Sequence, residues 1–389
     1  MKTAIIIAEY NPFHNGHAYQ LDAVRALGFD RIAVIMSGNF VQRGEAAIAD
    51  KSIRARAALE CGADLVAELP LPYAMATAER FAFGGVALAN AFAGSGATLF
   101  FGSESGDTAK LERTAELLCS DVVDGRIREL VAQGRSYALS RQLAVSDCGG
   151  DAELLTRPND ILAVEYLRHI LLGGRRISAA AIPRTKVEHD AFSPSGGFAS
   201  ASYLRGLCRE KGTAALRRYV PERALEAFFE EEERGGMPCD TARIGTAVLA
   251  RLRCMGAGDF AGLPDMSEGL PNRLYNVSRS AVTLDGFVSA ATTKRFPSAR
   301  IRRAAMNAFL GVPAELCRSA PEYLRILGMN SRGEELVRLA SRGIRAVASL
   351  TEIPERYALC DARATDLFDL CRPEPQGCGA EYRRRVIKI

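Results

Sequence analysis

Two histidines near the N-terminus have the types and spacing that could do chemistry. Only four histidines occur among the 389 residues, and His14 and His17 lie three positions apart with Gly16 between them. Side chains three residues apart on a helix share one face. The unpaired N–H groups and the dipole at a helix start favour phosphate. We therefore expect this pair, at a strand-to-helix turn, to stabilise charge that develops on a phosphoryl group.

A zinc site is the alternative for these two histidines. Zinc takes three or four protein ligands, and no third ligand stands near His14 and His17 in the sequence. The ten cysteines include no pair with the Cys-x2-Cys or Cys-x4-Cys spacing that is typical of zinc sites. We therefore expect no protein-held metal site, and we expect the thiols to pack as small apolar side chains.

An α/β fold is expected to position the histidine pair. Short β-branched runs alternate with helical stretches over the first 190 residues, which is typical of a parallel sheet covered by helices. The predicted strands are 3–8, 31–37, 65–68, 98–102 and 177–183, and the predicted helices are 17–27, 51–61, 78–93, 109–133 (broken) and 158–172. Ligands of such Rossmann-like sheets bind beyond the carboxyl ends of the strands. We therefore expect the site in the loops that follow these strands.

The second half of the chain differs in pattern and in charge. Strand-like runs become rare after about residue 200, which predicts a catalytic domain over 1–205 and a mostly helical region over 206–389. Residues 1–200 carry 20 Lys and Arg against 23 Asp and Glu, whereas residues 201–389 carry 30 against 23. The net charges of −3 and +7 add to the +4 of the whole chain. The basic half is therefore the candidate for binding a polyanion.

Basic residues of the second half form two clusters in the sequence. Their members are Lys294, Arg295, Arg300, Arg302 and Arg303 in one, and Arg383, Arg384 and Arg385 in the other. Arginine binds phosphate through two parallel hydrogen bonds, so both clusters are candidates for contacts with a nucleic-acid backbone. A solvated helix face is the alternative explanation.

The composition excludes several classes of protein. With 48% apolar and 25% charged residues, the chain is typical of a soluble globular protein and not of a disordered one. No run approaches the roughly 18 apolar residues of a membrane span. Glu9 and Asn11 interrupt the apolar start before it reaches the length of a signal-peptide core. We therefore expect a cytoplasmic protein without membrane contacts.

The spacing His-x-Gly-His at such a turn resembles the signature of the nucleotidylyltransferase superfamily, whose members attack the α-phosphate of ATP and release pyrophosphate. The superfamily's second signature is a Ser/Thr-rich turn that opens a helix and precedes an arginine. Residues 200–205 fit it, except that Ala201 occupies the middle position. The resemblance implies that Ser200 or Ser202 caps the helix beside phosphates and that Arg205 neutralises pyrophosphate. An ordinary cap with a surface arginine is the alternative.

Four segments together resemble the tRNA(Met) cytidine acetate ligase family, and the resemblance covers nearly the whole chain. These segments are residues 9–17, 37–43, 158–162 and 294–303. Enzymes of this bacterial family use ATP to activate acetate as acetyl-adenylate. They transfer the acetyl group to N4 of the wobble cytidine of elongator tRNA(Met), without acetyl-CoA. The resemblance implies ATP as co-substrate, Mg²⁺ as its counter-ion, and acetate and the tRNA anticodon loop as partners.

The resemblance also assigns residues to roles, with His14, His17 and Arg205 as the catalytic ones. The implied ATP contacts are Ile7, Ala8, Glu9, Tyr10, Asn11, Pro12, Phe13, His14, Asn15, Gly16, His17, Ala18, Tyr19, Gln20, Gly102, Asn159, Arg184, Ser200 and Ser202. The polar loop expected to close on the substrate contributes Ser37, Gly38, Asn39, Gln42, Arg43, Asp50 and Lys51. The expected tRNA contacts are Lys294, Arg295, Arg300, Arg302 and Arg303.

Two other functions stay open at this point. An adenylyltransferase that acts on a phosphorylated cofactor precursor would need little beyond the α/β domain, whereas this chain continues for about 180 residues beyond 205. A catalytically silent RNA-binding relative would keep the fold, although the intact His14, Gly16, His17 and Arg205 argue against it. Exchange of pyrophosphate into ATP with candidate acceptors distinguishes the three functions.

Overall fold

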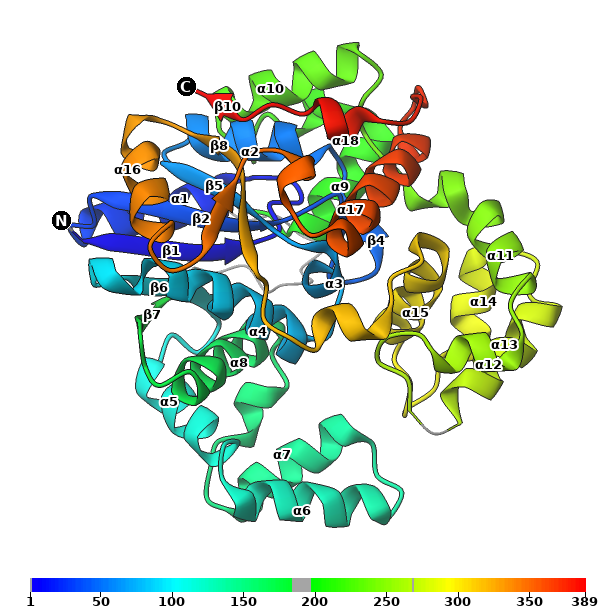
Figure 1. The fold of residues 1–389 in the computed structure, drawn as a ribbon. Helices are drawn as coiled ribbons and strands as arrows, with labels where there is room; N and C mark the ends of the chain where they lie inside the picture. The colour runs from blue at the N-terminus through cyan, green and yellow to red at the C-terminus, as the bar shows by residue number, and fades with distance from the viewer. Residues whose placement is uncertain (1, 184–196, 268) are drawn as a thin grey trace.

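The central element is a mixed sheet, which has eight strands in the residues that the structure describes (Figure 1). This computed structural model describes residues 2–183, 197–267 and 269–389. The strands follow the order β10-β8-β5-β2-β1-β6-β7, and β9 pairs with β8. Their bounds are β1 Thr3–Ala8, β2 Arg31–Ser37, β5 Leu65–Leu69, β6 Thr98–Ser103, β7 Ser178–Pro183, β8 Tyr323–Met329, β9 Arg345–Val347 and β10 Ile387–Lys388. A separate hairpin is formed by β3 (Phe40–Val41) and β4 (Glu45–Ala46).

The five predicted strands are confirmed to within one residue at either end, and they pair in parallel as β5-β2-β1-β6-β7. Alternate residues of β1 enter different cores, because Ala4 and Ile6 pack on one face of the sheet and Ile5 packs on the other. A strand buried on both faces reads as a continuous apolar run. This pattern is the reason that these strands could be predicted from the sequence.

Helices cover both faces of the sheet. Leu21 of α1 and Ala55 of α2 share the core of Ala4 and Ile6, whereas α4, α8 and α16 contribute to the core that contains Ile5. The helix bounds are α1 Asn15–Ala26, α2 Lys51–Glu60, α3 Leu71–Ala74, α4 Ala78–Ala89, α5 Thr108–Leu117, α6 Asp121–Ala132, α7 Tyr137–Asp147, α8 Pro158–Leu172, α9 Ala201–Lys211, α10 Glu222–Glu233, α11 Gly245–Arg253, α12 Ala257–Ala261, α13 Leu270–Ser280, α14 Leu284–Ala291, α15 Ser298–Leu310, α16 Ser331–Ala340, α17 Glu355–Phe368 and α18 Ala380–Arg383. Within the described ranges, no helix is both long enough and apolar enough to cross a membrane.

The strand order places a ligand site beyond β1. The chain moves from β1 to β2 and β5 on one side, and later passes to β6 and β7 on the other side of β1. At such a switch in strand order, the loops after the two central strands diverge and leave a crevice.

The predicted break in the helix over 109–133 is also confirmed, since α5 and α6 are separate helices.

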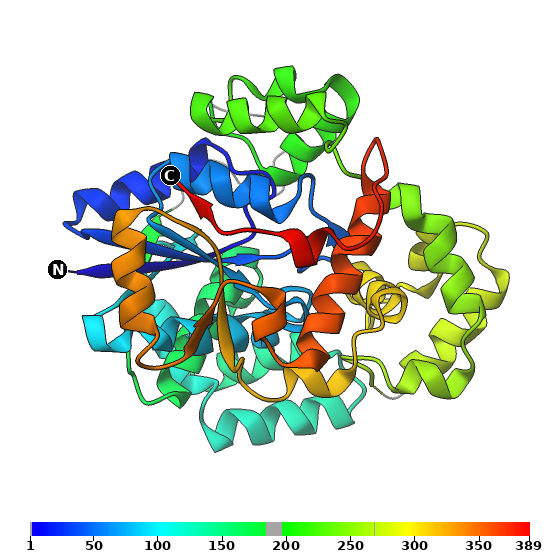
Figure 2. The ribbon, with the colours of Figure 1, turned by 45° about the horizontal axis from the view of Figure 1, so that its top comes forward.

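The C-terminal part of the chain returns to the sheet, which the sequence pattern did not predict. Strand β8 pairs antiparallel with β5, and both β9 and β10 pair in parallel with β8. Figure 2 shows the C-terminal segment, drawn in red, running back across the molecule to β10. The mostly helical region therefore also completes the sheet. The division of the chain at residue 205 stays a prediction.

Helices α11 to α15 form a lobe beside the sheet (Figures 1 and 2). The helices of this lobe contact one another, and α15 also contacts β4 and α17. This arrangement brings the basic stretch 294–303 next to the β3–β4 hairpin.

Candidate active site

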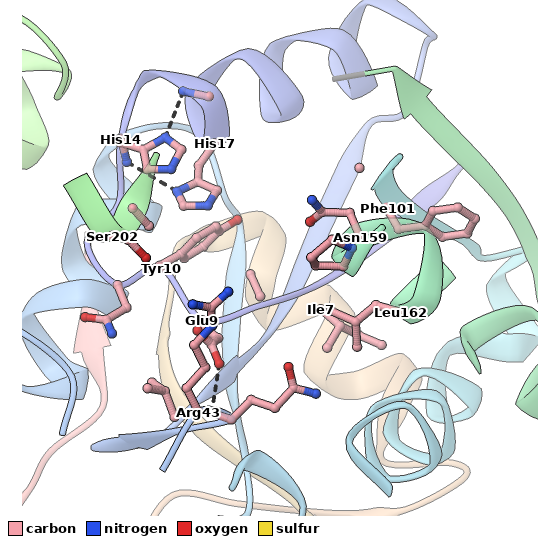
Figure 3. A pocket seen from close by; sticks show the side chains of 18 of the residues that line it. Ile7, Glu9, Tyr10, His14, His17, Arg43, Phe101, Asn159, Leu162 and Ser202 are labelled. Atoms are coloured by element: carbon pink, nitrogen blue, oxygen red, sulfur yellow. Dashed lines mark hydrogen bonds between the residues drawn. The ribbon is translucent and has the colours of Figure 1, made fainter. Parts of the chain in front are cut away.

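A cavity of about 440 Å³ opens where the switch in strand order predicts it (Figure 3). Its walls come from the end of β1 and the following loop, the start of α1, the β3–β4 hairpin, the ends of β6 and β7, and the first turns of α8 and α9. Segments nearly 200 residues apart in the sequence therefore meet around one space. The volume lies in the range of about 300–1,000 Å³ that is usual for ligand pockets.

His14 and His17 together cap the N-terminus of α1. The Nδ1 atom of His14 accepts a hydrogen bond from Gly16 N at 3.0 Å, and Nδ1 of His17 accepts one from His14 N at 3.3 Å (Figure 3). The two rings stack with their centroids 3.8 Å apart. Because each Nδ1 is an acceptor, a neutral ring carries its proton on Nε2. Both rings line the cavity and can offer Nε2–H to phosphoryl oxygens.

Gly16 keeps these rings in place because it has no side chain. A Cβ at this position would lie 2.8 Å from Cε1 and 3.1 Å from Nδ1 of His14. We expect Gly16→Ala to displace the ring and to lower the rate of pyrophosphate exchange by up to about 10²-fold, the cost of a misplacement near 1 Å. The unfolding temperature should change little, since the helix propensity that Ala gains over Gly offsets the weakened His14 cap. Exchange kinetics and thermal unfolding of the same preparation check both expectations; an unchanged exchange rate would contradict them.

The second predicted motif lies against the first. Ser200 caps α9 and accepts from Tyr203 N at 3.2 Å. Arg205 donates through Nη1 to Asn11 O at 3.0 Å and through Nη2 to Ser202 Oγ at 3.2 Å. Burial lowers the pKa of the Arg205 guanidinium, which is partly balanced by the carboxylates near it. Arg205 and Ser202 line the cavity, so one arginine links the two motifs at the cavity wall.

Glu9 is held by the loop that was expected to close on the substrate. Its Oε1 accepts from Gln42 N at 2.8 Å, and burial raises the pKa of the carboxyl. Arg54 is fully buried and donates to the carbonyls of Glu9 at 2.6 Å and Ser37 at 3.2 Å, and to that of Gly38. The ends of β1 and β2 are thereby fixed to α2. Gln42 and Arg43 of this loop line the cavity.

The other residues of the expected substrate loop lie away from the cavity. Asp50 and Lys51 are buried and lie outside the cavity lining, as do Ser37, Gly38 and Asn39. Lys51 Nζ lies 2.5 Å from Glu68 Oε1 and 2.6 Å from Glu381 Oε1. Arg384 donates hydrogen bonds to both carboxylate oxygens of Asp50, at 2.7 and 3.0 Å. These charges form a buried ion-pair cluster that fixes the C-terminal segment, and Arg384 is therefore not available to tRNA.

Five of the predicted ATP contacts lie outside the cavity lining. Pro12, Phe13, Asn15, Ala18 and Ser200 are absent from its lining in the described residues. Phe13 is fully buried in a core, whereas the Asn15 amide donates to Gly197 O and Arg218 O. The remaining predicted contacts in the described part line the cavity: Ile7, Ala8, Glu9, Tyr10, Asn11, His14, Gly16, His17, Tyr19, Gln20, Gly102, Asn159 and Ser202. Arg184 lies outside the described residues.

An apolar wall at one end of the cavity was missed by the sequence reasoning. Phe101 of β6 and Leu162 in the first turns of α8 lie near Ile7 (Figure 3). Tyr166, one turn later in α8, also lines the cavity. Asn159 also lines the cavity, and its side-chain amide donates a hydrogen bond to Glu104. The apolar residues that follow Pro158 at helical spacing were the sequence signal that could have predicted this wall. A flat aromatic base suits such a wall.

The basic stretch 294–303 is only partly exposed. Arg300 Nη2 lies 3.2 Å from Asp265 Oδ1, and Arg303 Nη2 lies 3.4 Å from Asp265 Oδ2. Arg302 pairs with Glu45 at 2.9 Å. Lys294 and Arg295 are exposed. The structure thus brings Arg303 into the cavity lining and leaves Lys294 and Arg295 as the members facing solvent.

The chain matches known proteins along nearly its whole length. A family model described as HIGH Nucleotidyl Transferase matches residues 1–381. A tRNA(Met) cytidine acetate ligase of Thermoanaerobacter sp. (strain X514) is 32% identical and the match covers 99% of both chains. The chain belongs to the tRNA(Met) cytidine acetate ligase family. A further member, from Thermotoga maritima, is 34% identical, with 95% of this chain and 96% of that protein covered.

Solved structures of this family, whose name is abbreviated TmcAL, have the same fold. The crystal structure of Thermotoga maritima TmcAL in an apo form has a TM-score of 0.93, with 32% identity and full coverage of both chains. A second crystal structure of that protein, bound with alpha-thio ATP, has a TM-score of 0.89 and 31% identity. The predicted α/β fold, with a parallel sheet followed by a helical region, is therefore confirmed.

Proposed function

We propose that this chain is an ATP-dependent ligase that activates acetate as acetyl-adenylate. It then transfers the acetyl group to N4 of the wobble cytidine of elongator tRNA(Met), which forms N4-acetylcytidine. The observation that supports this most strongly is the match of the whole chain to members of the tRNA(Met) cytidine acetate ligase family. The cavity that contains His14, His17 and Arg205 is the proposed site of both steps.

In the first step a carboxylate oxygen of acetate attacks the α-phosphorus of ATP, and pyrophosphate leaves with the electron pair of the broken P–O bond. His14 and His17 donate Nε2–H to the phosphoryl oxygens on which charge builds, while Arg205 offsets the charge of pyrophosphate. No protein nucleophile is needed, because phosphoryl transfer is catalysed mainly by positioning and by electrostatics. The apolar wall at Phe101 and Leu162 is the proposed place of the adenine.

Mg²⁺ is proposed as the counter-ion of the triphosphate. In the described residues, no three His, Cys, Asp or Glu side chains are grouped so that they could hold a metal. Mg²⁺ is usually bound through substrate phosphates, waters and one or two carboxylates, and Glu9 lines the cavity. When bound, the ion would neutralise phosphate charge. Acetyl-CoA is not part of the proposed reaction.

Acetate-dependent exchange of labelled pyrophosphate into ATP tests the first step. We expect exchange with acetate and ATP alone, because acetyl-adenylate forms reversibly in the cavity. Exchange that requires a phosphorylated cofactor precursor would support the adenylyltransferase, and a lack of exchange with any acceptor would support the catalytically silent relative. The full-length family match favours the ligase.

The two solvent-facing residues of the basic stretch are proposed to contact the tRNA backbone. We expect the double substitution Lys294→Ala/Arg295→Ala to weaken tRNA binding and to leave ATP binding unchanged. The slope of log K against log salt concentration should fall by about 0.7 for each single-strand phosphate that the variant no longer neutralises. Filter binding at several salt concentrations measures the slope. Substituting Arg332, an exposed arginine of α16, is the matched control; an equal weakening in that variant would contradict a specific contact.

A further inference from the structure

A second cavity, of about 300 Å³, lies between the β3–β4 hairpin and helices α11, α14 and α15. It is large enough for a ligand of nucleoside size. Among the described residues, Glu45 is the one that lines both this cavity and the ATP-site cavity. The Glu45 carboxylate therefore lies between the two spaces.

Beside Glu45, at Gly44, the boundary between the two cavities is closely packed. Gly44 has a φ of +75°, and a Cβ there would lie 2.6 Å from Arg303 N and 2.8 Å from the carbonyl carbon of Arg302. The turn of the hairpin thus rests directly on the backbone of α15. Arg303 lines the ATP-site cavity and its neighbour Arg302 lines the second one, so the wall is made by α15 and the hairpin together.

Glu45 is held at this junction by arginines from both sides. Its Oε1 accepts from Arg302 Nη1 at 2.9 Å. Its Oε2 lies 4.0 Å from Nη2 of Arg205, the arginine that links the two catalytic motifs. Because arginines hold both of its oxygens, the Glu45 carboxylate keeps one orientation between the two cavities.

The lining of the second cavity suits one nucleotide of an RNA. Arg209 and Arg302 line the cavity beside their partners Asp240 and Glu45, and the hydroxyls of Thr241, Thr246 and Thr283 suit a ribose. Val288 and Met306 supply apolar surface for a base. Carboxylates such as Asp240 and Glu45 accept from the exocyclic amine of cytosine. An anticodon-loop base is unpaired and can be turned out into such a pocket.

We propose that the second cavity receives the wobble cytidine and that Glu45 accepts the proton of its N4 amine during acetyl transfer, an assignment that rests on the proposed function. N4 attacks the carbonyl carbon of acetyl-adenylate, and a C–N bond forms. The bond between that carbon and the phosphate oxygen breaks, and its electron pair leaves with AMP. The amine proton passes to the Glu45 carboxylate and from there to water.

Separate measurement of the two half-reactions tests the role of Glu45. In Glu45→Gln, we expect the single-turnover rate of acetyl transfer to an unmodified tRNA(Met) transcript to fall about 100-fold more than acetate-dependent exchange, the usual size of general-base catalysis. Glu45→Asp should restore part of the rate, with little effect of either variant on KM for tRNA. Equal losses in both half-reactions would overturn the assignment, because they would place Glu45 in ATP chemistry.

Filling the second cavity tests its occupant. Thr246 is exposed and lines the cavity, whereas its exposed neighbour Ala247 does not. We expect Thr246→Trp to raise KM for tRNA at least about 10-fold, a binding loss of about 1.4 kcal/mol, and Ala247→Trp to leave both half-reactions as in the wild type. An unchanged KM in Thr246→Trp would overturn the cavity assignment. Absence of exchange or of transfer in the wild type would instead overturn the proposed function itself.

Discussion

The substitutions His14→Asn and His17→Gln are each expected to lower the rate of acetate-dependent pyrophosphate exchange about 10²–10³-fold. This is the usual cost of losing one hydrogen-bond donor to a charged transition state. In each imidazole Nδ1 is committed to the cap of α1, so Nε2–H is the group that the substitution removes from the phosphoryl oxygens. Initial exchange rates of His14→Asn and His17→Gln at saturating ATP and acetate measure the loss.

The two substitutions are chosen so that the helix cap survives. Asn is among the best N-cap residues, and Gln at the third helical position reaches back to the N-cap N–H as His17 does. We therefore expect the free energy of unfolding to change by less than about 1 kcal/mol. Exchange within a few-fold of the wild-type rate in correctly folded variants would show that the imidazoles only shape the turn.

Arg384→Met is expected to lower the free energy of unfolding by about 3 kcal/mol. Its guanidinium binds both oxygens of Asp50, and the two side chains are 12% and 3% exposed. Removing one partner of a buried ion pair leaves the other charge uncompensated, which costs about 3–5 kcal/mol. The lower end applies because Arg372 Nη2 still lies 3.7 Å from Asp50. Urea unfolding measures the difference.

Two controls separate the ion pair from other effects of this change. Arg385→Met removes an exposed neighbouring charge and should have little effect on stability. The double variant Asp50→Asn/Arg384→Met should recover part of the loss, because it leaves no carboxylate buried at position 50 while Asn still caps α2. If the double variant is no more stable than Arg384→Met, the loss came from packing.

The same pair makes stability depend on acid pH. Burial by itself raises the pKa of Asp50, but Arg384 more than offsets this and holds the pKa well below its ordinary value of 3.8. A carboxyl with a depressed folded-state pKa stabilises the fold above its unfolded-state pKa, and this contribution disappears as the pH falls through the folded-state value. Between pH 7 and pH 4, the pair should keep most of its contribution. Below that range, the difference between wild type and Arg384→Met should shrink.

Local sequence signals were sufficient to predict the parallel strands and the two motifs at the cavity. Continuous apolar runs predicted the parallel strands, and the spacing of His14, Gly16 and His17 predicted a helix start that holds both imidazoles, which the structure forms. Arg205 was predicted by its own short motif, and it meets Asn11 in the fold. In each case, the residues that define the feature lie within a few positions of one another, so the sequence carries the whole pattern.

Long-range pairing explains what could not be predicted. Asp50 and Lys51 resemble the polar end of a substrate loop, but their partners Arg384 and Glu381 come from the far end of the chain. Strand β8 was missed because Arg325 interrupts its apolar pattern, and this arginine is buried only because Glu68 and Glu381 surround it. No local window contains both members of these pairs.

Analysis of tRNA nucleosides by mass spectrometry tests the proposed reaction most directly. The intact chain is incubated with ATP, isotopically labelled acetate and unmodified elongator tRNA(Met), and the tRNA is then digested to nucleosides. We expect labelled N4-acetylcytidine at the wobble position in reactions that contain ATP, with no acetyl-CoA added, and none in a transcript with uridine at that position. Unmodified cytidine after verified acetate-dependent turnover of ATP would contradict the proposed function.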